Sequence, residues 1–333
     1  MKACRTARVL QFAFMPSGEI ESLLETVRQS GAASHRALGR LVRLVDDDDR
    51  ASDSIDEAIK SGAFRAARVG LTGPPGGGKS TLIAAAIEIL AETRKRIGIL
   101  AVDPTSPFTG GALLGDRVRL KGPIGENVFF RSLASRGALG GVSNAIWPAS
   151  RLLDWWGADI ILIETVGTGQ LGIAVRDVAD LVVAVLTPET GDGIQSMKAG
   201  VMELADCFIV NKSDRPGSEL MLKELSLVQE EARAARRSVK VFQTSALNGD
   251  GIEEATDGLA ALWRYLIESG EISRRRVEQV RREVAFRTER RIQARMASAL
   301  GGAEAYDSAL SEWAKRILSG EATASAAAAE LAR

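Results

Sequence analysis

This sequence of 333 residues is poor in histidine and cysteine. His35 is the one histidine, which excludes histidine-based catalysis and histidine metal clusters, and we expect it at the surface, on the polar side of its helix. Cys4 and Cys207 are the two cysteines, too few to form a disulfide framework in a chain of this length, and neither has a neighbour at metal-ligand spacing. We therefore expect a reducing, cytoplasmic environment.

The sequence also lacks an excess of charge of either sign. Lys+Arg and Asp+Glu both number 43, so nucleic acid is not an expected partner. No apolar run approaches the roughly 20 residues that span a bilayer, so no membrane association is expected. The first 18 residues carry no acid, but their mildly apolar run is too short to predict a targeting segment, and Met15 is an alternative start.

A glycine-rich stretch dominates what is present. Residues 73–80 satisfy G-x-x-x-x-G-K-[ST], the phosphate-binding loop, between an apolar strand-like run and a helix-forming segment. Glycines let the backbone wrap around a phosphate, with the field of a helix N-terminus in support. Lys79 is expected at the β- and γ-phosphates and Ser80 on Mg²⁺. The loop residues expected to bind nucleotide are Gly73, Gly76, Gly77, Gly78, Lys79, Ser80 and Thr81.

From residue 67 onward, short β-rich runs alternate with helical segments, which predicts an α/β fold with a mostly parallel sheet of about seven strands. In such sheets ligands bind beyond the carboxyl ends of the strands. The predicted strands are 69–72, 97–102, 128–133, 160–164, 181–186, 207–210 and 239–243.

Helical segments are expected at both ends of this domain. Two amphipathic helices precede the phosphate loop, and the acidic run 46–49 is interpreted as a solvated helix end. An arginine-rich helix with the apolar stripe Val277, Val280 and Val284 follows the domain. We expect that stripe to pack on another subunit, with a phosphate- or RNA-binding arm as the alternative. The predicted division is 1–66 (N-terminal helical segment), 67–269 (phosphate-loop domain) and 270–333 (C-terminal helical arm).

Acidic residues follow two of the predicted strands. Asp103 ends the second strand and Asp116 lies in the loop after it, so both can act on Mg²⁺ or its waters, although either could instead cap a helix or turn. Glu164 ends the fourth strand, three residues before Gly167, an arrangement typical of a carboxylate that acts on Mg²⁺ and a glycine N–H that senses γ-phosphate. Gln170 is a candidate to position water, with a plain polar loop residue as the alternative.

Two further strand ends predict the base. Asn211, Lys212 and Asp214 form N-K-x-D, in which the aspartate can accept two hydrogen bonds from guanine that adenine cannot offer. After the next strand come Ser245, Ala246 and Leu247, and the Ala246 N–H can donate to guanine O6. Together these motifs predict GTP rather than ATP.

With these motifs the chain resembles the MeaB/ArgK (human MMAA-like) G proteins, which chaperone adenosylcobalamin-dependent acyl-CoA mutases such as methylmalonyl-CoA mutase. The resemblance covers about residues 19–300. Beyond the nucleotide motifs it rests on the segments 101–106, 109–111, 114–116, 131–132, 135–137, 139–141, 164–167, 169–170, 191–195, 198–200 and 205–206.

The resemblance implies a homodimeric GTPase that gates cofactor loading of a mutase, with a cobalamin adenosyltransferase as a further candidate partner. It assigns Mg²⁺ to Ser80, Asp103, Asp116 and Glu164, and an additional switch to residues 191–198. The family usually has Ser-Glu after the glutamine, where this chain has Leu171-Gly172.

Several alternatives stay open. A nucleotide-dependent protein kinase is one, as the older family name suggests, and a dimer that binds GTP without hydrolysing it is another. A metal-insertion GTPase of hydrogenase or urease type is disfavoured by the single histidine and the isolated Cys207. Which mutase is served, and whether Gln170 or Asp103 positions the attacking water, the sequence leaves undecided.

Overall fold

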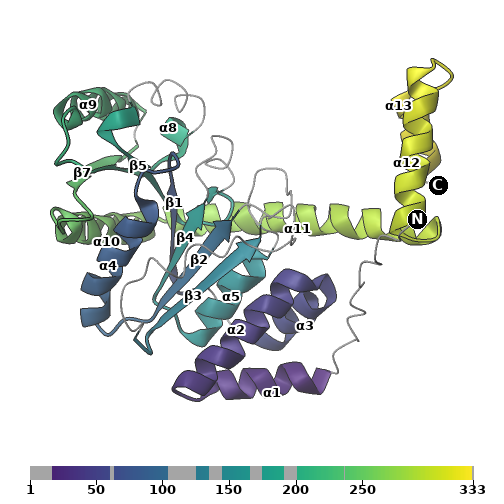
Figure 1. Cartoon of the computed structure of the whole chain (residues 1–333), viewed down its shortest axis with the longest axis horizontal. Coiled ribbons are helices and arrows are strands. Elements are labelled where there is room, and N and C mark those ends of the chain that lie inside the picture. Colours follow the sequence, from purple (N-terminus) through teal and green to yellow (C-terminus); the bar gives the residue numbers. More distant parts are fainter. Residues whose placement is uncertain are drawn as a thin grey trace, which may run out of the picture. The chain divides into compact units, whose positions relative to one another are not determined.

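A computed structural model of the chain describes residues 17–60, 64–103, 125–134, 145–165, 175–190, 201–235 and 237–331. It divides into two compact units, Met1–Arg275 and Arg276–Arg333. The first unit contains a sheet with helices on both faces, and the second is helical (Figure 1).

All seven strands of the first unit are parallel and form one sheet in the order β3-β2-β4-β1-β5-β6-β7. Their carboxyl ends therefore meet along one edge. The predicted fold class is confirmed, and each strand lies within two residues of its predicted range. The strands are β1 (Ala67–Thr72), β2 (Ile97–Asp103), β3 (Val128–Ala134), β4 (Ile160–Thr165), β5 (Leu181–Leu186), β6 (Cys207–Asn211) and β7 (Lys240–Thr244).

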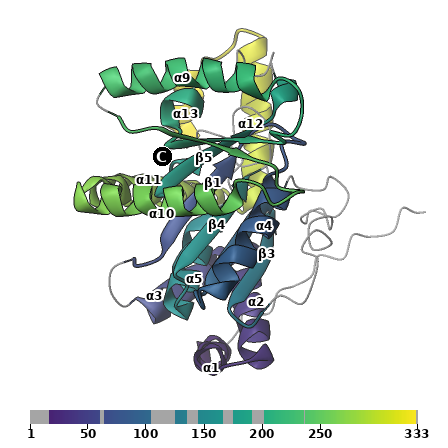
Figure 2. The ribbon, with the colours of Figure 1, turned by 90° about the vertical axis from the view of Figure 1, so that its left-hand side faces the viewer.

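Three hydrophobic clusters join the helices to the sheet. Alternate residues of a strand point to opposite faces, so Ile161 and Ile163 of β4 face one set of helices and Leu162 faces another. One face is covered by α1 (Ser17–Arg28), α2 (Ala32–Asp47), α3 (Asp49–Ile59) and α5 (Ile146–Trp156) over β2–β4, and by α8 (Val201–Leu204) and α9 (Ser218–Ala234) over β5 and β6. The other face carries α4 (Lys79–Glu92) and α10 (Ile252–Glu268), which lie side by side (Figures 1 and 2).

The described part of the N-terminal segment, residues 17–60 and 64–66, contains three helices, not the two predicted. Helix α3 begins at Asp49, the last residue of the acidic run, and the Asp48 carboxylate caps it by accepting the Arg50 N–H at 2.8 Å. Its polar sequence conceals Ile55 and Ile59, one turn apart and both buried. The acidic run is thus the junction between α2 and α3.

His35 is also not the plain surface residue that was predicted. Its ring is half-buried, 5.5 Å from the Trp156 ring and 6.3 Å from the Phe129 ring. Trp156 belongs to α5, a helix the sequence reasoning did not identify. His35 therefore helps to join the N-terminal helices to the sheet.

Buried ion pairs lie at the edge of the sheet where the strands begin. The Arg68 guanidinium contacts the Asp180 carboxylate at 2.7 Å, with the two side chains 7% and 0% exposed. Nearby, Arg275 at the start of α11 (Glu271–Ala299) makes two 2.9 Å hydrogen bonds to Asp206, and Arg176 contacts the same carboxylate at 3.3 Å. These pairs attach the strand starts and the beginning of α11 to one another.

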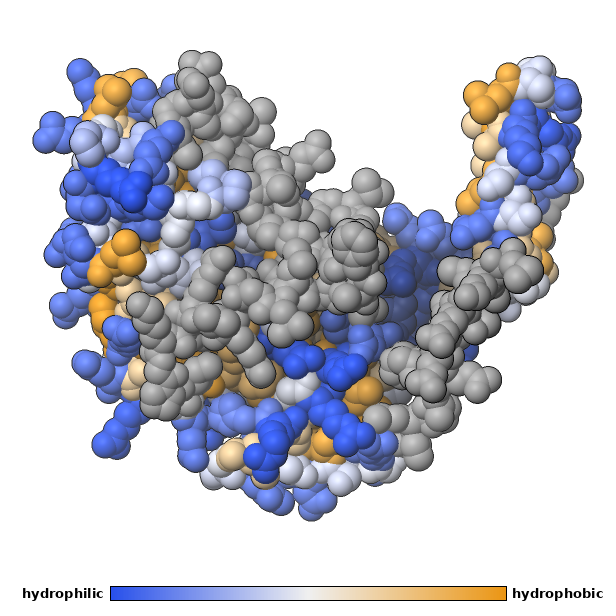
Figure 3. Space-filling view, in the orientation of Figure 1, coloured by the Kyte–Doolittle hydropathy of each residue, from blue (hydrophilic) through white to orange (hydrophobic). Residues whose placement is uncertain are grey.

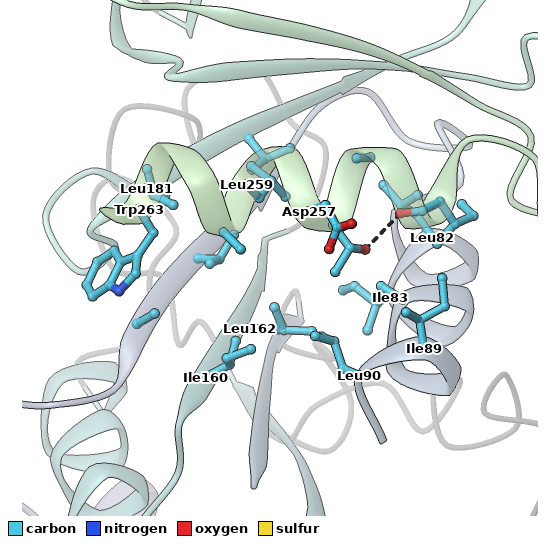
Figure 4. A pocket seen from close by; sticks show the side chains of 18 of the residues that line it. Leu82, Ile83, Ile89, Leu90, Ile160, Leu162, Leu181, Asp257, Leu259 and Trp263 are labelled. Atoms are coloured by element: carbon cyan, nitrogen blue, oxygen red, sulfur yellow. Dashed lines mark hydrogen bonds between the residues drawn. The ribbon is translucent and has the colours of Figure 1, made fainter. Parts of the chain in front are cut away.

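An apolar cavity of about 380 Å³ lies between α4, α10 and the sheet (Figure 4). Leu82, Ile83 and Ala86 line it from α4, and Leu259 and Trp263 line it from α10. Thr93, Lys95 and Asp159, near the starts of the strands, also line it, so it reaches the edge of the sheet opposite the carboxyl ends.

The second unit consists of most of α11, followed by α12 (Ala303–Leu318) and α13 (Ala324–Leu331). The predicted stripe on α11 is solvent-exposed, with Val277, Val280 and Val284 at 62%, 43% and 57%. Leu318 is 88% exposed, and apolar residues are visible along one edge of α12 and α13 in Figure 3. Within the described ranges, no helix has the length and apolarity needed to cross a membrane.

Candidate nucleotide-binding site

The phosphate loop connects β1 to α4 at the carboxyl edge of the sheet. Gly73 has φ 140°, and a Cβ there would lie 2.1 Å from the carbonyl oxygen of Val185 in β5. Gly78 has φ 82°, and its Cβ would lie 2.3 Å from the Asn211 amide nitrogen. Only glycine fits at either position, because a side chain would meet both a disfavoured φ and occupied space.

Lys79 is the first residue of α4, and only 7% of its surface is exposed. Its ammonium donates to the carbonyls of Gly73 and Pro74, at 2.9 and 3.0 Å. The charge is thus held inside the curve of the loop, where the N-terminus of α4 also favours an anion. Ser80 and Thr81 follow in the first turn of the same helix.

Two oxygen groups predicted to act on Mg²⁺ meet directly. The Ser80 hydroxyl donates to Glu164 Oε1 at 2.6 Å, although the two residues are 84 positions apart. Parallel pairing of β1 with β4 brings them together, because it sets Leu71 beside Glu164. A hydroxyl and a carboxylate at this separation suit Mg²⁺, which prefers oxygen ligands and usually keeps phosphate and water as the others.

Other residues assigned to the metal and the water lie outside what is described. Asp103 is the last residue of β2, at the same edge of the sheet, but its side chain is not described, and Asp116, Gly167, Gln170 and segment 191–200 fall outside the described ranges. In those ranges no group of three or more His, Cys, Asp or Glu side chains is placed to hold a metal.

Asn211 connects the predicted base-binding loop to the phosphate loop. Its Nδ2 donates to the Gly77 carbonyl at 3.0 Å, while its Oδ1 accepts from the Thr244 hydroxyl and the Ala246 N–H, both at 3.1 Å. Asn211 is the last residue of β6, Thr244 is the last residue of β7, and Gly77 lies in the phosphate loop. One buried amide therefore sets the spacing between the phosphate loop and both base motifs.

Asp214 is oriented by the second base motif. The Ser245 hydroxyl donates to Asp214 Oδ1 at 2.6 Å, and this bond lowers the pKa of the carboxyl below its usual value. The carboxylate is therefore kept ionised, the form that accepts hydrogen bonds. The Ala246 N–H, assigned from sequence to guanine O6, here donates to Asn211, and the Leu247 side chain is 83% exposed.

Sequence reasoning missed two residues that hold this site. Thr244 bonds Asn211, and Glu189 contacts both Lys212 and Arg215. Thr244 ends β7 directly before Ser245, so its position at a strand end was an available signal. Glu189 follows β5 by three residues, and no motif marked it.

A protein-family comparison decides what this arrangement belongs to. Residues 38–300 match the model of the methylmalonyl-CoA mutase-associated GTPase MeaB. The chain belongs to the MeaB family. A protein of Pyrococcus horikoshii named as a GTPase is 39% identical over 273 residues, covering 80% of this chain and 84% of that protein. The chain is thus a P-loop GTPase that binds nucleotide, as its motifs predicted.

Another sequence relative and a solved structure also resemble this chain. The mouse mitochondrial protein called methylmalonic aciduria type A homolog is 39% identical over 221 residues, which are 64% of this chain and 52% of the mouse protein. The crystal structure of a LAO/AO transport system kinase superposes with a TM-score of 0.65 and 21% identity, covering 96% of this chain and 98% of that one. At that identity the superposition supports the fold alone.

Proposed function

We propose that this GTPase binds an adenosylcobalamin-dependent acyl-CoA mutase and uses GTP hydrolysis to gate loading or protection of the cobalamin cofactor. The observation that carries the proposal is the match of residues 38–300 to the mutase-associated family. The mouse relative's name, which refers to methylmalonic aciduria, supports the same class of client.

In the proposed chemistry the chain positions GTP and water and supplies few reacting groups. Lys79 and the loop N–H groups would hold the phosphates, and Asp214 would accept from the guanine edge. Ser80 and Glu164 would hold Mg²⁺ together with Asp103 and Asp116, and Gly167 would sense the γ-phosphate. When bound, Mg²⁺ neutralises charge that develops on the phosphate oxygens. Gln170 or Asp103 would orient the attacking water.

A homodimer is part of the proposal. The valine stripe of α11 and Leu318 of α12 expose apolar surface within the second unit, and such surface commonly marks an interface.

The proposed domain division remains 1–66, 67–269 and 270–333. We place the protein in a reducing cytoplasm, with the thiol of Cys207 buried in β6 and its pKa raised by that burial.

Reconstitution with a purified cobalamin-dependent mutase tests the proposal. Sedimentation of the mixture should show a complex whose affinity differs between GDP and a non-hydrolysable GTP analogue, and adenosylcobalamin transfer to the mutase should follow the same nucleotide dependence. Lys79→Ala is the matched control, since it should remove the dependence. A chain that hydrolyses GTP but binds the mutase in no nucleotide state would refute the client while leaving the GTPase in place. The label of γ-labelled GTP should be recovered as free inorganic phosphate and not as phosphoprotein. This result separates hydrolysis from the kinase alternative.

A further inference from the structure

The carboxylate of Glu189 bridges two cations of the predicted base-binding loop. It lies in a short 3-10 helix, Pro188–Thr190, which begins two residues after the end of β5. Lys212 Nζ donates to its Oε2 at 3.2 Å, and Arg215 Nη1 donates to its Oε1. In the described part of the chain, no other acidic side chain pairs with either cation. Glu189 is therefore the acid that connects the end of β5 to this loop.

The rest of the loop is held from other directions. Asn211 attaches it to the phosphate loop through the Gly77 carbonyl, at 3.0 Å. On the β7 side, the Ser213 N–H donates to the Thr244 carbonyl at 3.0 Å, and Asp214 accepts from Ser245. Neither attachment fixes the side chain of Lys212, which is the task left to Glu189.

Lys212 also has an unusual backbone. Its φ is +57°, in the left-handed region of backbone conformation that residues other than glycine, asparagine and aspartate rarely adopt. Such a conformation persists where surrounding contacts determine it, and it is concentrated at ligand sites. The Arg215 N–H donates to the Lys212 carbonyl at 3.0 Å, so the turn between them is closed while Glu189 holds the two side chains.

The strength of this contact sets the size of its effect. The side chains of Glu189, Lys212 and Arg215 are 47%, 25% and 47% exposed, and exposed ion pairs contribute little individually. The Glu189 carboxylate, however, is attracted by two cations, so both ion pairs stabilise the position of the same side chain. Arg215 lowers the pKa of Glu189 through a hydrogen bond, with Lys212 adding to it, so the bridge is charged throughout the neutral range.

We propose that Glu189 is a positioning residue for guanine nucleotide, holding Lys212 in the orientation from which its side chain meets the base and thereby slowing nucleotide dissociation. The inference rests on the proposed guanine site at Asn211–Asp214 and adds to it a residue outside the motif. Pre-organising a side chain before the ligand arrives removes part of the ordering cost of binding, which shows mainly in the dissociation rate.

Stopped-flow dissociation of a fluorescent GDP tests this in the full chain. Glu189→Gln should raise the dissociation rate about three- to ten-fold, Arg215→Gln by about two-fold, and Glu189→Asp by less than Glu189→Gln. Turnover at saturating GTP should be unchanged while KM rises, a split that a purely structural role would not produce. Glu219→Gln, an exposed acid in the first turn of α9, is the charge-matched control and should leave dissociation unchanged.

High salt provides a second readout. Since the bridge is partly exposed, the difference between wild type and Glu189→Gln should shrink at about 1 M salt, where charges are screened beyond roughly 3 Å. Equal dissociation rates for the wild type and Glu189→Gln in low salt would overturn the inference. Failure of Asp214→Asn to change base preference would instead overturn the guanine site itself, so the two failures are distinguishable.

Discussion

The hydroxyl of Ser80 lies 2.6 Å from Oε1 of Glu164, across the join between β1 and β4. This contact places the two oxygen groups where one cation can meet both. We expect Ser80→Ala and Glu164→Gln each to raise the Mg²⁺ concentration for half-maximal GTP hydrolysis about 10- to 100-fold. GDP affinity measured in EDTA should change much less. An unaltered Mg²⁺ titration in both variants would remove this pair from the metal site.

Lys79→Ala should abolish measurable nucleotide binding. The ammonium is buried in the phosphate loop and donates to the Gly73 and Pro74 carbonyls, so its loss removes the positive charge from the loop and one donor from each carbonyl. Calorimetric titration with GTP and GDP measures this, with circular dichroism as the check on folding. Undiminished affinity in a folded variant would contradict the assignment.

Asp214→Asn should shift preference from guanine toward xanthine. An amide in place of the carboxylate offers a donor where guanine also donates, while xanthine presents an oxygen there. Competition between GDP and xanthosine diphosphate gives the ratio, and an unchanged ratio counts against the base assignment.

The wild-type preference should also persist into acid. The hydrogen bond from Ser245 lowers the pKa of the Asp214 carboxyl. The contribution of the Asp214 carboxylate to guanine binding is therefore present above the ordinary aspartate pKa and is lost only as pH falls through the lowered value. A Ser245→Ala variant should lose guanine preference at a higher pH than wild type.

Asp180→Ala should destabilise the first unit by about 3–5 kcal/mol, since it removes a fully buried carboxylate that pairs with the buried Arg68 guanidinium. Chemical denaturation followed by fluorescence measures the loss. Asp56→Ala, which breaks the more exposed pair with Arg151, is the comparison and should cost less. Equal losses would show that burial of the ion pair does not control its contribution.

Ala86→Leu should raise the free energy of unfolding by about 0.5–2 kcal/mol, because the added atoms fill part of the 380 Å³ cavity beneath α4. Ala84→Leu, on the same helix but not lining the cavity, controls for helix propensity and should change stability little. Destabilisation by Ala86→Leu alone would indicate that the cavity closes in solution.

The strand pattern was predictable because continuous apolar runs between glycine-bearing loops are specific to buried parallel strands. The phosphate loop and Asp214 were identified for a related reason: their chemistry requires particular residue types at fixed spacing. Helix α3 was not predictable, since its apolar residues are few and its first turn is acidic. Glu189 escaped because its role depends on two side chains that only the sheet brings near, and His35 because its aromatic neighbours come from β3 and α5.

The position of β1 in the sheet has a consequence for biosynthesis. Strand β1 is the first of the strands to be synthesised, but its two neighbours in the sheet are β4 and β5. Ala67 therefore cannot pair with Ile160 until β4 has been synthesised. A ribosome-bound nascent chain that ends before β4 therefore carries its glycine loop on an unpaired apolar strand, a segment that invites chaperone capture. GTP is expected to protect the nascent protein from protease only after β6 and β7, whose ends carry the predicted base-binding residues, have left the exit tunnel.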